Sequence, residues 1–433
     1  MSTNQTKSFN TTGPCVPSDH YMLPPLPRVS EIKGLLEKKH YFVLHAPRQS
    51  GKTTAIMAAV DQLNEDGAYY ALYCTLEALR GVTDRTETML LLENLITDSL
   101  QNSNVEALRR ATDCSFLAEV KTLPAFNSFP LKILLREQCK KLDKNLVIFF
   151  DEVDTLEDQA MLSFLSQLRD GYVNRSKTPF PRSIALVGMR NIRDYKVRIR
   201  SESESLGSSS PFNIIAEALT LTNFTLDEIR TLYSQHTEAT GQSFAEEATQ
   251  SAWYWSEGQP WLVNALARQA VEKILAGDYG KDVTADHIDE AADILMRRRD
   301  PHIDSLLARL HEPRVQRIIG PMLATTKYYE ADPDIEDETD DLGELYYDNH
   351  QVDESYDDAL QSCLDLGLVK NGESLRPATP IYASVIVRFI GLDAQSKLPR
   401  DIKGKWMDGQ NLDMTGLLRS FQQFWARLSA KFL

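Results

Sequence analysis

The hydrophobic and polar positions divide the chain into two halves with different patterns. In the first half, short continuous apolar runs, typical of strands buried on both faces, alternate with helical patterns. Because strands separated by helices imply right-handed crossovers, this half predicts an α/β fold with a parallel sheet covered by helices on both faces. The expected strands cover residues 42–44, 68–75, 146–150, 183–188 and 211–221. Helical patterns fit residues 30–38, 85–103, 131–143 and 156–174.

The second half is helical almost throughout. It begins with Thr225-Leu226-Asp227-Glu228, which has the pattern of a helix capping box. Near its end, Asn371-Gly372 predicts a turn, followed by residues 375–377 and an apolar stretch at 381–390. Helices followed by a strand, a turn and a strand favour a winged-helix-like module behind a small all-α domain. The expected helices cover residues 225–239, 244–256, 260–276, 284–299, 302–324 and 357–370.

These patterns predict five segments. They are a Pro-rich arm with a first helix (1–40), the sheet domain (41–222), a helical lid (223–300), a winged-helix-like domain (301–395) with an acidic insert (328–358), and a linker with an amphipathic helix (396–433).

The two ends of the chain each leave alternatives open. The arm is extended by its prolines, so an aromatic and a basic residue on it could pack on a bound base, or the arm could cover a sheet edge. Residues 412–433 place apolar side chains on one helical face, which needs a partner surface. That surface could belong to the protein's own core, a further domain or another chain. Few basic residues there argue against a membrane-surface role.

Composition narrows the class of protein. A chain of 433 residues, 42% hydrophobic, is too long for one ordinary domain and has enough apolar side chains for several cores. No apolar run approaches 18 residues and the polar N-terminus lacks a signal-peptide pattern, so we expect no transmembrane segment. The five cysteines are scattered without CxxC spacing, which predicts reduced thiols in a cytoplasmic protein.

The net charge of −15 comes from one region. Residues 328–358 hold 14 acidic and no basic residues, and without them the rest of the chain carries a net charge of −1. Such blocks are usually solvated loops, although this one could shield a DNA surface or attract a basic partner. The sequence therefore gives no support for broad electrostatic attraction to nucleic acid.

The candidate chemistry starts directly after the first strand. Ala46, four further residues, Gly51, Lys52 and Thr53 match the phosphate-binding loop pattern, except that Ala46 replaces the usual first glycine. Backbone N–H groups of the loop and the following helix N-terminus would bind phosphates, Lys52 would reach the terminal phosphates, and Thr53 would offer its hydroxyl to Mg²⁺. The predicted nucleotide contacts are Ala46, Pro47, Arg48, Gln49, Ser50, Gly51, Lys52, Thr53 and Thr54.

Acidic and polar side chains follow two later strands. Asp151 ends the strand at 146–150 and is predicted to hold Mg²⁺ together with the loop threonine. Glu152 is predicted to orient and deprotonate the attacking water. At the end of the strand at 183–188, Arg190 or Asn191 could sense the γ-phosphate, whereas a solvent-facing strand end is the alternative.

These motifs, in this order, resemble the AAA-like ATPases, in the branch that includes archaeal-type, origin-recognition-type and signalling NTPases. The phrases Phe9–Cys15, Gly188–Tyr195 and Pro380-Ile381-Tyr382 resemble a bacterial group of AAA-like ATP-binding proteins. The resemblance covers about residues 9–395. It implies that Pro260, in a Gly-Gln-Pro turn between two helices, contacts the nucleotide with Trp261 packed beneath it. Such relatives often continue into a nuclease-like domain, whose residues are not visible in 396–433.

Together the residues and the resemblance predict an ATP-dependent switch that hydrolyses ATP with Mg²⁺ and couples lid movement to the winged-helix-like module. ATP is preferred over GTP because no Asn-Lys-x-Asp pattern is present. A DNA-associated ATPase and a non-hydrolysing ATP-binding scaffold are the alternatives. The expected partners are the nucleotide and a protein or missing effector domain bound through the C-terminal helix. Nucleic acid and homo-oligomers stay open, and no membrane is expected.

Overall fold

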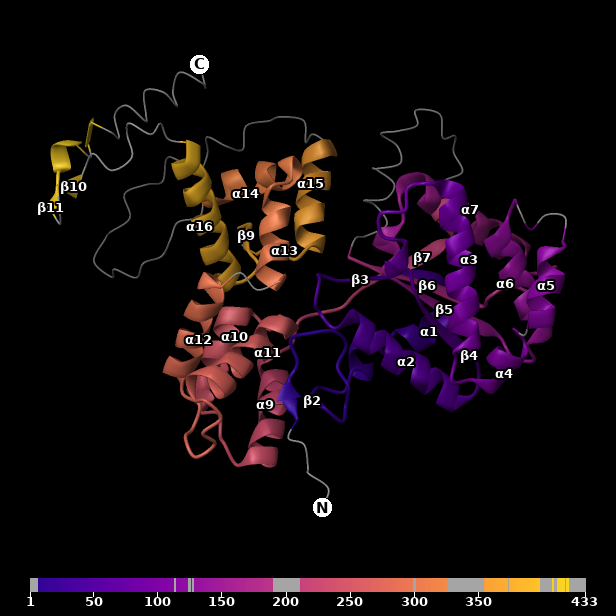
Figure 1. Cartoon of the computed structure of the whole chain (residues 1–433), viewed down its shortest axis with the longest axis horizontal. Coiled ribbons are helices and arrows are strands. Elements are labelled where there is room, and N and C mark those ends of the chain that lie inside the picture. The colour runs from indigo at the N-terminus through magenta and orange to yellow at the C-terminus, as the bar shows by residue number, and fades with distance from the viewer. Residues whose placement is uncertain are drawn as a thin grey trace.

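The computed structural model describes most of the chain and separates it into two lobes (Figure 1). Strands and helices of the first half form one lobe, and helices of the second half form the other. Within the described residues, no helix combines the length and the hydrophobicity that crossing a membrane requires. The described residues are 7–112, 114–123, 126, 128–189, 211–298, 301–325, 354–372, 374–397, 407–408, 411–416 and 418–419.

A five-stranded sheet forms the centre of the first lobe, with the order β4-β5-β6-β3-β7. All of its strand pairs are parallel, as the sequence predicts. The last strand is shorter than expected, because residues 211–214 form a 3-10 turn before it. The strands are β3 (Tyr41–His45), β4 (Tyr70–Thr75), β5 (Leu146–Asp151), β6 (Ser183–Gly188) and β7 (Ile215–Thr220).

The central strands are apolar at every position because both faces of the sheet are covered. On β3, Tyr41 and Val43 belong to one hydrophobic cluster, whereas Phe42 and Leu44 belong to another. The first cluster includes residues of α3, α6 and α7, and the second includes residues of α1 and α2. The helices of this lobe are α1 (Ile32–Glu37), α2 (Lys52–Asp66), α3 (Arg85–Gln101), α4 (Glu106–Arg110), α5 (Cys114–Lys121), α6 (Pro130–Lys141) and α7 (Asp158–Asn174).

The first four helices of the second lobe match the expected all-α region. The capping box is confirmed: Thr225 caps α9 and exchanges hydrogen bonds with Glu228. The helix expected at 260–276 changes to π-helical geometry at residue 269. These elements are α9 (Leu226–Thr240), α10 (Glu246–Ser256), α11 (Pro260–Arg268) with η5 (Gln269–Ile274), and α12 (Ala285–Arg297).

The C-terminal region differs from the sequence prediction at two points. The single helix expected at 302–324 is wrong: the segment breaks before Pro313, which opens a new helix at its first position. The apolar stretch at 381–390 is helical, so the hairpin that precedes it has only two residues in each strand. The elements are α13 (Pro301–Leu310), α14 (Pro313–Thr325), α15 (Glu354–Asp365), β8 (Val369–Lys370), β9 (Arg376–Pro377), α16 (Pro380–Lys397), β10 (Met407–Asp408) and β11 (Asn411–Leu412).

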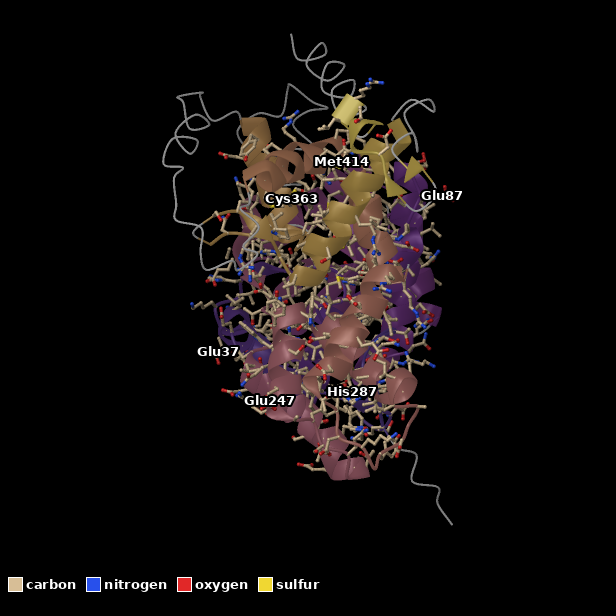
Figure 2. All side chains as sticks on the ribbon, turned by 90° about the vertical axis from the view of Figure 1, so that its left-hand side faces the viewer. Glu37, Glu87, Glu247, His287, Cys363 and Met414 are labelled. Carbon is tan, nitrogen blue, oxygen red and sulfur yellow. The ribbon has the colours of Figure 1, made fainter. Side chains whose placement is uncertain are left out.

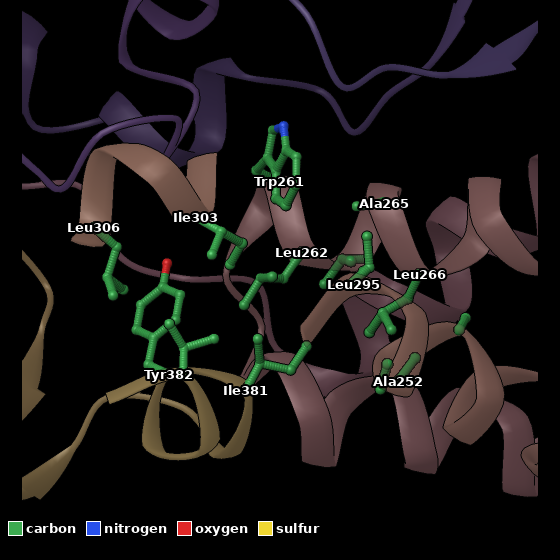
Figure 3. Packing of buried hydrophobic residues seen from close by; sticks show 14 of the residues in the cluster. Ala252, Trp261, Leu262, Ala265, Leu266, Leu295, Ile303, Leu306, Ile381 and Tyr382 are labelled. Atoms are coloured by element: carbon green, nitrogen blue, oxygen red, sulfur yellow. The ribbon is translucent and has the colours of Figure 1, made fainter. Parts of the chain in front are cut away.

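One hydrophobic cluster joins the lid helices to this C-terminal region. Figure 3 shows Trp261 and Leu262 of α11 packed near Ile303 of α13 and Ile381 of α16. Figure 2 looks onto this lobe, with His287 of the lid near one end and Cys363 of α15 towards the other. The arm contributes to the same cluster through Phe9 and Tyr21, which pair as the short strands β1 (Ser8–Phe9) and β2 (His20–Tyr21).

Several predictions lie outside the described residues. They include Arg190 and Asn191, most of the acidic insert at 328–358, and most of the amphipathic helix expected at 412–433.

Candidate functional site

The loop between β3 and α2 has the backbone that an anion-binding loop requires. Gln49 (φ 59°) and Gly51 (φ 85°) adopt left-handed conformations, which turn successive N–H groups towards one side. Ala46 does not adopt a positive φ, so its methyl group is accommodated without backbone strain and is fully buried. The alanine that replaces the usual glycine therefore fits this loop.

Lys52 is held inside the loop that precedes it. Its Nζ donates hydrogen bonds to the carbonyl oxygens of Ala46 (2.7 Å) and Pro47 (2.9 Å). Burial lowers the pKa of the Lys52 ammonium, against the nearby charges of Glu152 and Asp151. A buried ammonium whose hydrogen-bond partners are neutral carbonyls is positioned to bind an anion that enters the loop.

Asp151 connects the loop to the sheet. The Thr53 hydroxyl donates to Asp151 Oδ2 at 2.8 Å, and the Tyr73 hydroxyl donates to the same oxygen at 3.0 Å. The parallel register of β4 and β5 pairs Thr75 with Asp151, which brings the Tyr73 side chain within reach. Burial and the Asp151 charge raise the pKa of Tyr73, so its hydroxyl stays protonated and donates. No sequence motif marks Tyr73 as a site residue, because its position beside Asp151 depends on strand register.

The residues at this point fit a magnesium ion. Mg²⁺ prefers oxygen ligands and is usually bound by one or two protein groups together with water and phosphate oxygens. Thr53 and Asp151 supply a hydroxyl and a buried carboxylate that already lie 2.8 Å apart. Among the described residues, no three His, Cys, Asp or Glu side chains form a group that could hold a metal by themselves. The donor set therefore suits a metal that arrives with phosphate.

Glu152 has a strained backbone and a perturbed carboxyl group. Its φ of 56° lies in the left-handed region, where non-glycine residues are uncommon and often functional. Burial, followed by the charge of Asp151, raises the pKa of Glu152, which makes its carboxylate a better proton acceptor. Arg80 Nη2 lies 3.5 Å from this carboxylate and also pairs with Glu77 at 2.7 Å.

The end of β6 lies beside this acidic group. The Asp154 carboxylate accepts a hydrogen bond from the backbone N–H of Met189, and a Cβ on Gly188 would come within 2.4 Å of it. Met189 lines the same cavity as Lys52 and Glu152. The proposed sensors that follow, Arg190 and Asn191, remain predictions because they are not among the described residues.

The Gly-Gln-Pro turn of the lid faces the phosphate loop. Gln259 caps α11 by accepting from the N–H of Leu262 (2.6 Å). Its Nε2 also lies 3.5 Å from the carbonyl oxygens of both Arg48 and Gln49. Pro260 lines the cavity, and the nucleotide contact that the family resemblance implies for it stays a prediction.

The N-terminal arm forms another wall. Trp261 Nε1 donates to the carbonyl oxygen of Thr11 at 2.9 Å, which fixes the arm against the lid. Arg28 donates to the carbonyl oxygens of Ser50 (3.2 Å) and Thr222, and its guanidinium lies 5.0 Å from the Phe224 ring centre. The arm therefore lies between the lobes, and Arg28 is a site residue that periodicity alone could not identify.

The C-terminal region closes the site from a third side. His302 of α13 hydrogen-bonds through Nδ1 to the side-chain oxygen of Gln49 in the loop. His302 also stacks on Trp261, with ring centres 4.4 Å apart, and its Nε2 lies 2.6 Å from the Tyr382 hydroxyl. No motif in the sequence predicts these contacts.

A cavity of about 340 Å³ lies between these walls. The arm, the phosphate loop, the lid and α13 all contribute lining residues, with Glu152 at the sheet edge and Asn264 on the lid. Its size suits a nucleotide-sized ligand. Thr53, Glu152 and Pro260 line this cavity, and Asp151 accepts a hydrogen bond from Thr53.

Comparisons with known proteins identify the fold of this chain. No protein-family model and no curated protein matches the chain. Among solved structures, the Walker-type ATPase of Pyrococcus abyssi matches with a TM-score of 0.56 and 14% identity, over 88% of this chain and 99% of that one. The ORC2 protein of Aeropyrum pernix matches with a TM-score of 0.44 and 15% identity, over 85% and 95%. The RuvB branch migration motor of Thermotoga maritima matches with a TM-score of 0.38 and 13% identity, over 82% of this chain and 91% of that one. From the first of these likenesses, the chain has the fold of a Walker-type P-loop ATPase with helical C-terminal domains.

Proposed function

We propose that this protein binds ATP with Mg²⁺, hydrolyses it and uses the nucleotide state as a switch. The observation that supports this most directly is the 2.8 Å hydrogen bond from Thr53 to Asp151, beside the Lys52 loop and on a nucleotide-sized cavity. A phosphate loop, a strand-end carboxylate and a metal-binding hydroxyl are the parts that phosphoryl transfer requires.

Each residue has a role in this proposal. Loop N–H groups from Ala46 to Thr54 and the N-terminus of α2 bind the phosphates, with Lys52 on the terminal ones. Thr53 and Asp151 hold Mg²⁺, which when bound would neutralise developing phosphate charge. Glu152 accepts the proton of the attacking water. Arg190 or Asn191 senses the γ-phosphate.

The lid and the winged-helix-like region transmit the nucleotide state. The long 3.5 Å contacts from Gln259 to the loop carbonyls would tighten or separate as phosphates enter. Pro260 would touch the nucleotide directly. The shared hydrophobic cluster would carry the lid displacement to α13 and α16.

Nucleotide binding is tested with Lys52→Ala. Calorimetric titration with ATP and Mg²⁺ should show binding to the wild type and none to the variant, because the buried ammonium lies inside the loop that would bind the phosphates. Lys33→Ala is a matched control, since Lys33 pairs with Asp66 at the surface of the same lobe. An unchanged ATP affinity in Lys52→Ala would refute the proposal.

Hydrolysis is tested separately from binding. The Glu152 carboxylate lies 3.5 Å from Arg80, an arrangement that favours a second candidate, an ATP-binding scaffold that does not hydrolyse. Phosphate release should be measured for the wild type and Glu152→Gln. A rate that the substitution reduces by about 100-fold supports hydrolysis, whereas equal, near-zero rates support the scaffold.

The chain's family, its place in the cell and its partners are further parts of the proposed function. We propose that the chain belongs to the bacterial AAA-like group, acts in the cytoplasm and engages a protein partner or effector domain through residues 412–433. Homo-oligomers are tested by size measurement with and without ATP and Mg²⁺, on wild type and Glu152→Gln. DNA binding is tested with duplex DNA, where a steep loss of affinity with salt would support it.

A further inference from the structure

Helix α13 lies beside the phosphate loop and carries two polar side chains on one face. His302 and Arg309 are seven residues apart, which places them on the same side of a helix at about two turns' distance. His302 hydrogen-bonds to Gln49 of the loop, and Arg309 lines the nucleotide cavity. The C-terminal region thus brings a guanidinium to the same space as Lys52 and Glu152.

The position of α13 is fixed by contacts at its sides. Leu306 and Leu310, on the neighbouring stripe, are buried in the hydrophobic cluster. The loop after α15 also rests on the phosphate loop: a Cβ on Gly367 would come within 2.5 Å of the Pro47 ring. The helix therefore has little freedom to withdraw Arg309 while these contacts persist.

Among the described residues, the positive charge of Arg309 is only partly balanced, because it shares its carboxylate partner with a second arginine. Glu312 accepts hydrogen bonds from Arg309 (2.7 Å) and from Arg314 (2.9 Å). Burial opposes the ionisation of Glu312, but these two hydrogen bonds outweigh it and hold its pKa below the usual value. One carboxylate thus pairs with two guanidinium groups, so the three side chains together carry one net positive charge. The Arg309 side chain is 29% exposed, so an anion in the cavity can reach it.

We propose that Arg309 is a phosphate ligand supplied by the C-terminal region of the same chain, and that it binds the terminal phosphate of a nucleoside triphosphate. This rests on the proposed nucleotide site. A guanidinium binds phosphate oxygens through strong charge-assisted hydrogen bonds, which would be made only when the terminal phosphate is present. Loss of that phosphate then releases α13 from the nucleotide.

Arg309→Ala and Arg314→Ala form a matched pair for the test. Each removes one guanidinium from Glu312, but only Arg309 lines the cavity. Titrations should use a non-hydrolysable ATP analogue with Mg²⁺, and ADP in parallel. For Arg309→Ala we expect affinity for the analogue to fall about 10-fold or more and affinity for ADP by less than about 3-fold. Arg314→Ala should bind both as the wild type does.

A second readout separates a ligand from a structural residue. The ATP analogue should protect the backbone amides of α13 from hydrogen exchange in wild type and Arg314→Ala, and this protection should be lost in Arg309→Ala. Arg309→Lys keeps the charge and should recover part of the affinity, and it replaces the alanine variant if that one misfolds. Equal analogue affinities in Arg309→Ala and Arg314→Ala, with Lys52→Ala still defective, would overturn this inference and leave the proposed function standing. A wild type that binds no nucleotide would overturn both.

Discussion

His302 should make the stability of the protein depend on pH in a specific window. It lies where the phosphate loop, the lid and the C-terminal region meet, bonded to Gln49 and Tyr382 and stacked on Trp261. Burial, together with the positive charge of Arg48, lowers the pKa of His302 to about 3. An unfolded histidine has its ordinary pKa of 6.5, so the two states bind different numbers of protons between these values.

The sign follows from which state holds the proton. Between pH 6.5 and about 3, the unfolded chain is protonated at His302 and the folded chain is not, so the free energy of unfolding decreases as the pH falls. Between pH 7 and pH 5, the titration of this residue alone should lower the free energy of unfolding by about 2 kcal/mol. His302→Gln removes the titrating group and keeps a side chain that can hydrogen-bond. The variant should therefore lose about 2 kcal/mol less than the wild type over that range.

The assay is urea unfolding at pH 7 and pH 5, followed by the fluorescence of the five tryptophans, one of which, Trp261, stacks on His302. Tyr382→Phe is the control, because it removes the hydroxyl partner of Nε2 but leaves the histidine to titrate. Its stability should fall at both pH values while the pH dependence remains. If His302→Gln shows the same loss between pH 7 and pH 5 as the wild type, the assignment of a neutral buried His302 is wrong.

Two further substitutions test the geometry of the site. Gly258→Ala should lower the free energy of unfolding by at least about 2 kcal/mol. The reason is that the φ of Gly258 is 75° and an added Cβ would come within 1.8 Å of the Phe224 carbonyl oxygen. Chemical denaturation measures this free energy, and a change below about 0.5 kcal/mol would contradict the prediction. Tyr73→Phe should lower the free energy of unfolding by about 1.5–3 kcal/mol, the usual contribution of a hydrogen bond to a charged group such as Asp151. A Tyr73→Phe variant with wild-type stability would show that this bond is not formed in solution.

The sequence predicts the sheet well because its signal is local. Each continuous apolar run needs cover on two faces, and residues 146–150 and 183–188 indeed lie in the centre of the sheet. The phosphate loop is equally local, since its spacing must match a strand, a turn and a helix. Ala46 shows the limit of pattern matching: its negative φ makes a methyl group acceptable where the pattern expects glycine.

The other walls of the site could not be predicted, because they depend on contacts between distant segments. Arg28 reaches Ser50 and Thr222 only because the arm passes between the lobes. Arg309 reaches the cavity only because α13 packs against the lid. The helix at residues 381–390 could not be assigned from the sequence for a related reason, since a short apolar run is compatible with a strand or with one side of a buried helix. Tertiary packing selected the helix.

The distribution of apolar contacts indicates where a nucleotide could cause movement. The arm, the lid and the C-terminal region share one hydrophobic cluster, whereas the sheet lobe has two clusters of its own. Polar contacts join the lobes at the site, through Gln49 with His302 and Gln259 with the loop carbonyls. Separating polar contacts that water can replace costs much less free energy than opening a buried apolar cluster. We therefore expect the lid and the C-terminal region to move together against the sheet lobe, with the cavity at their boundary.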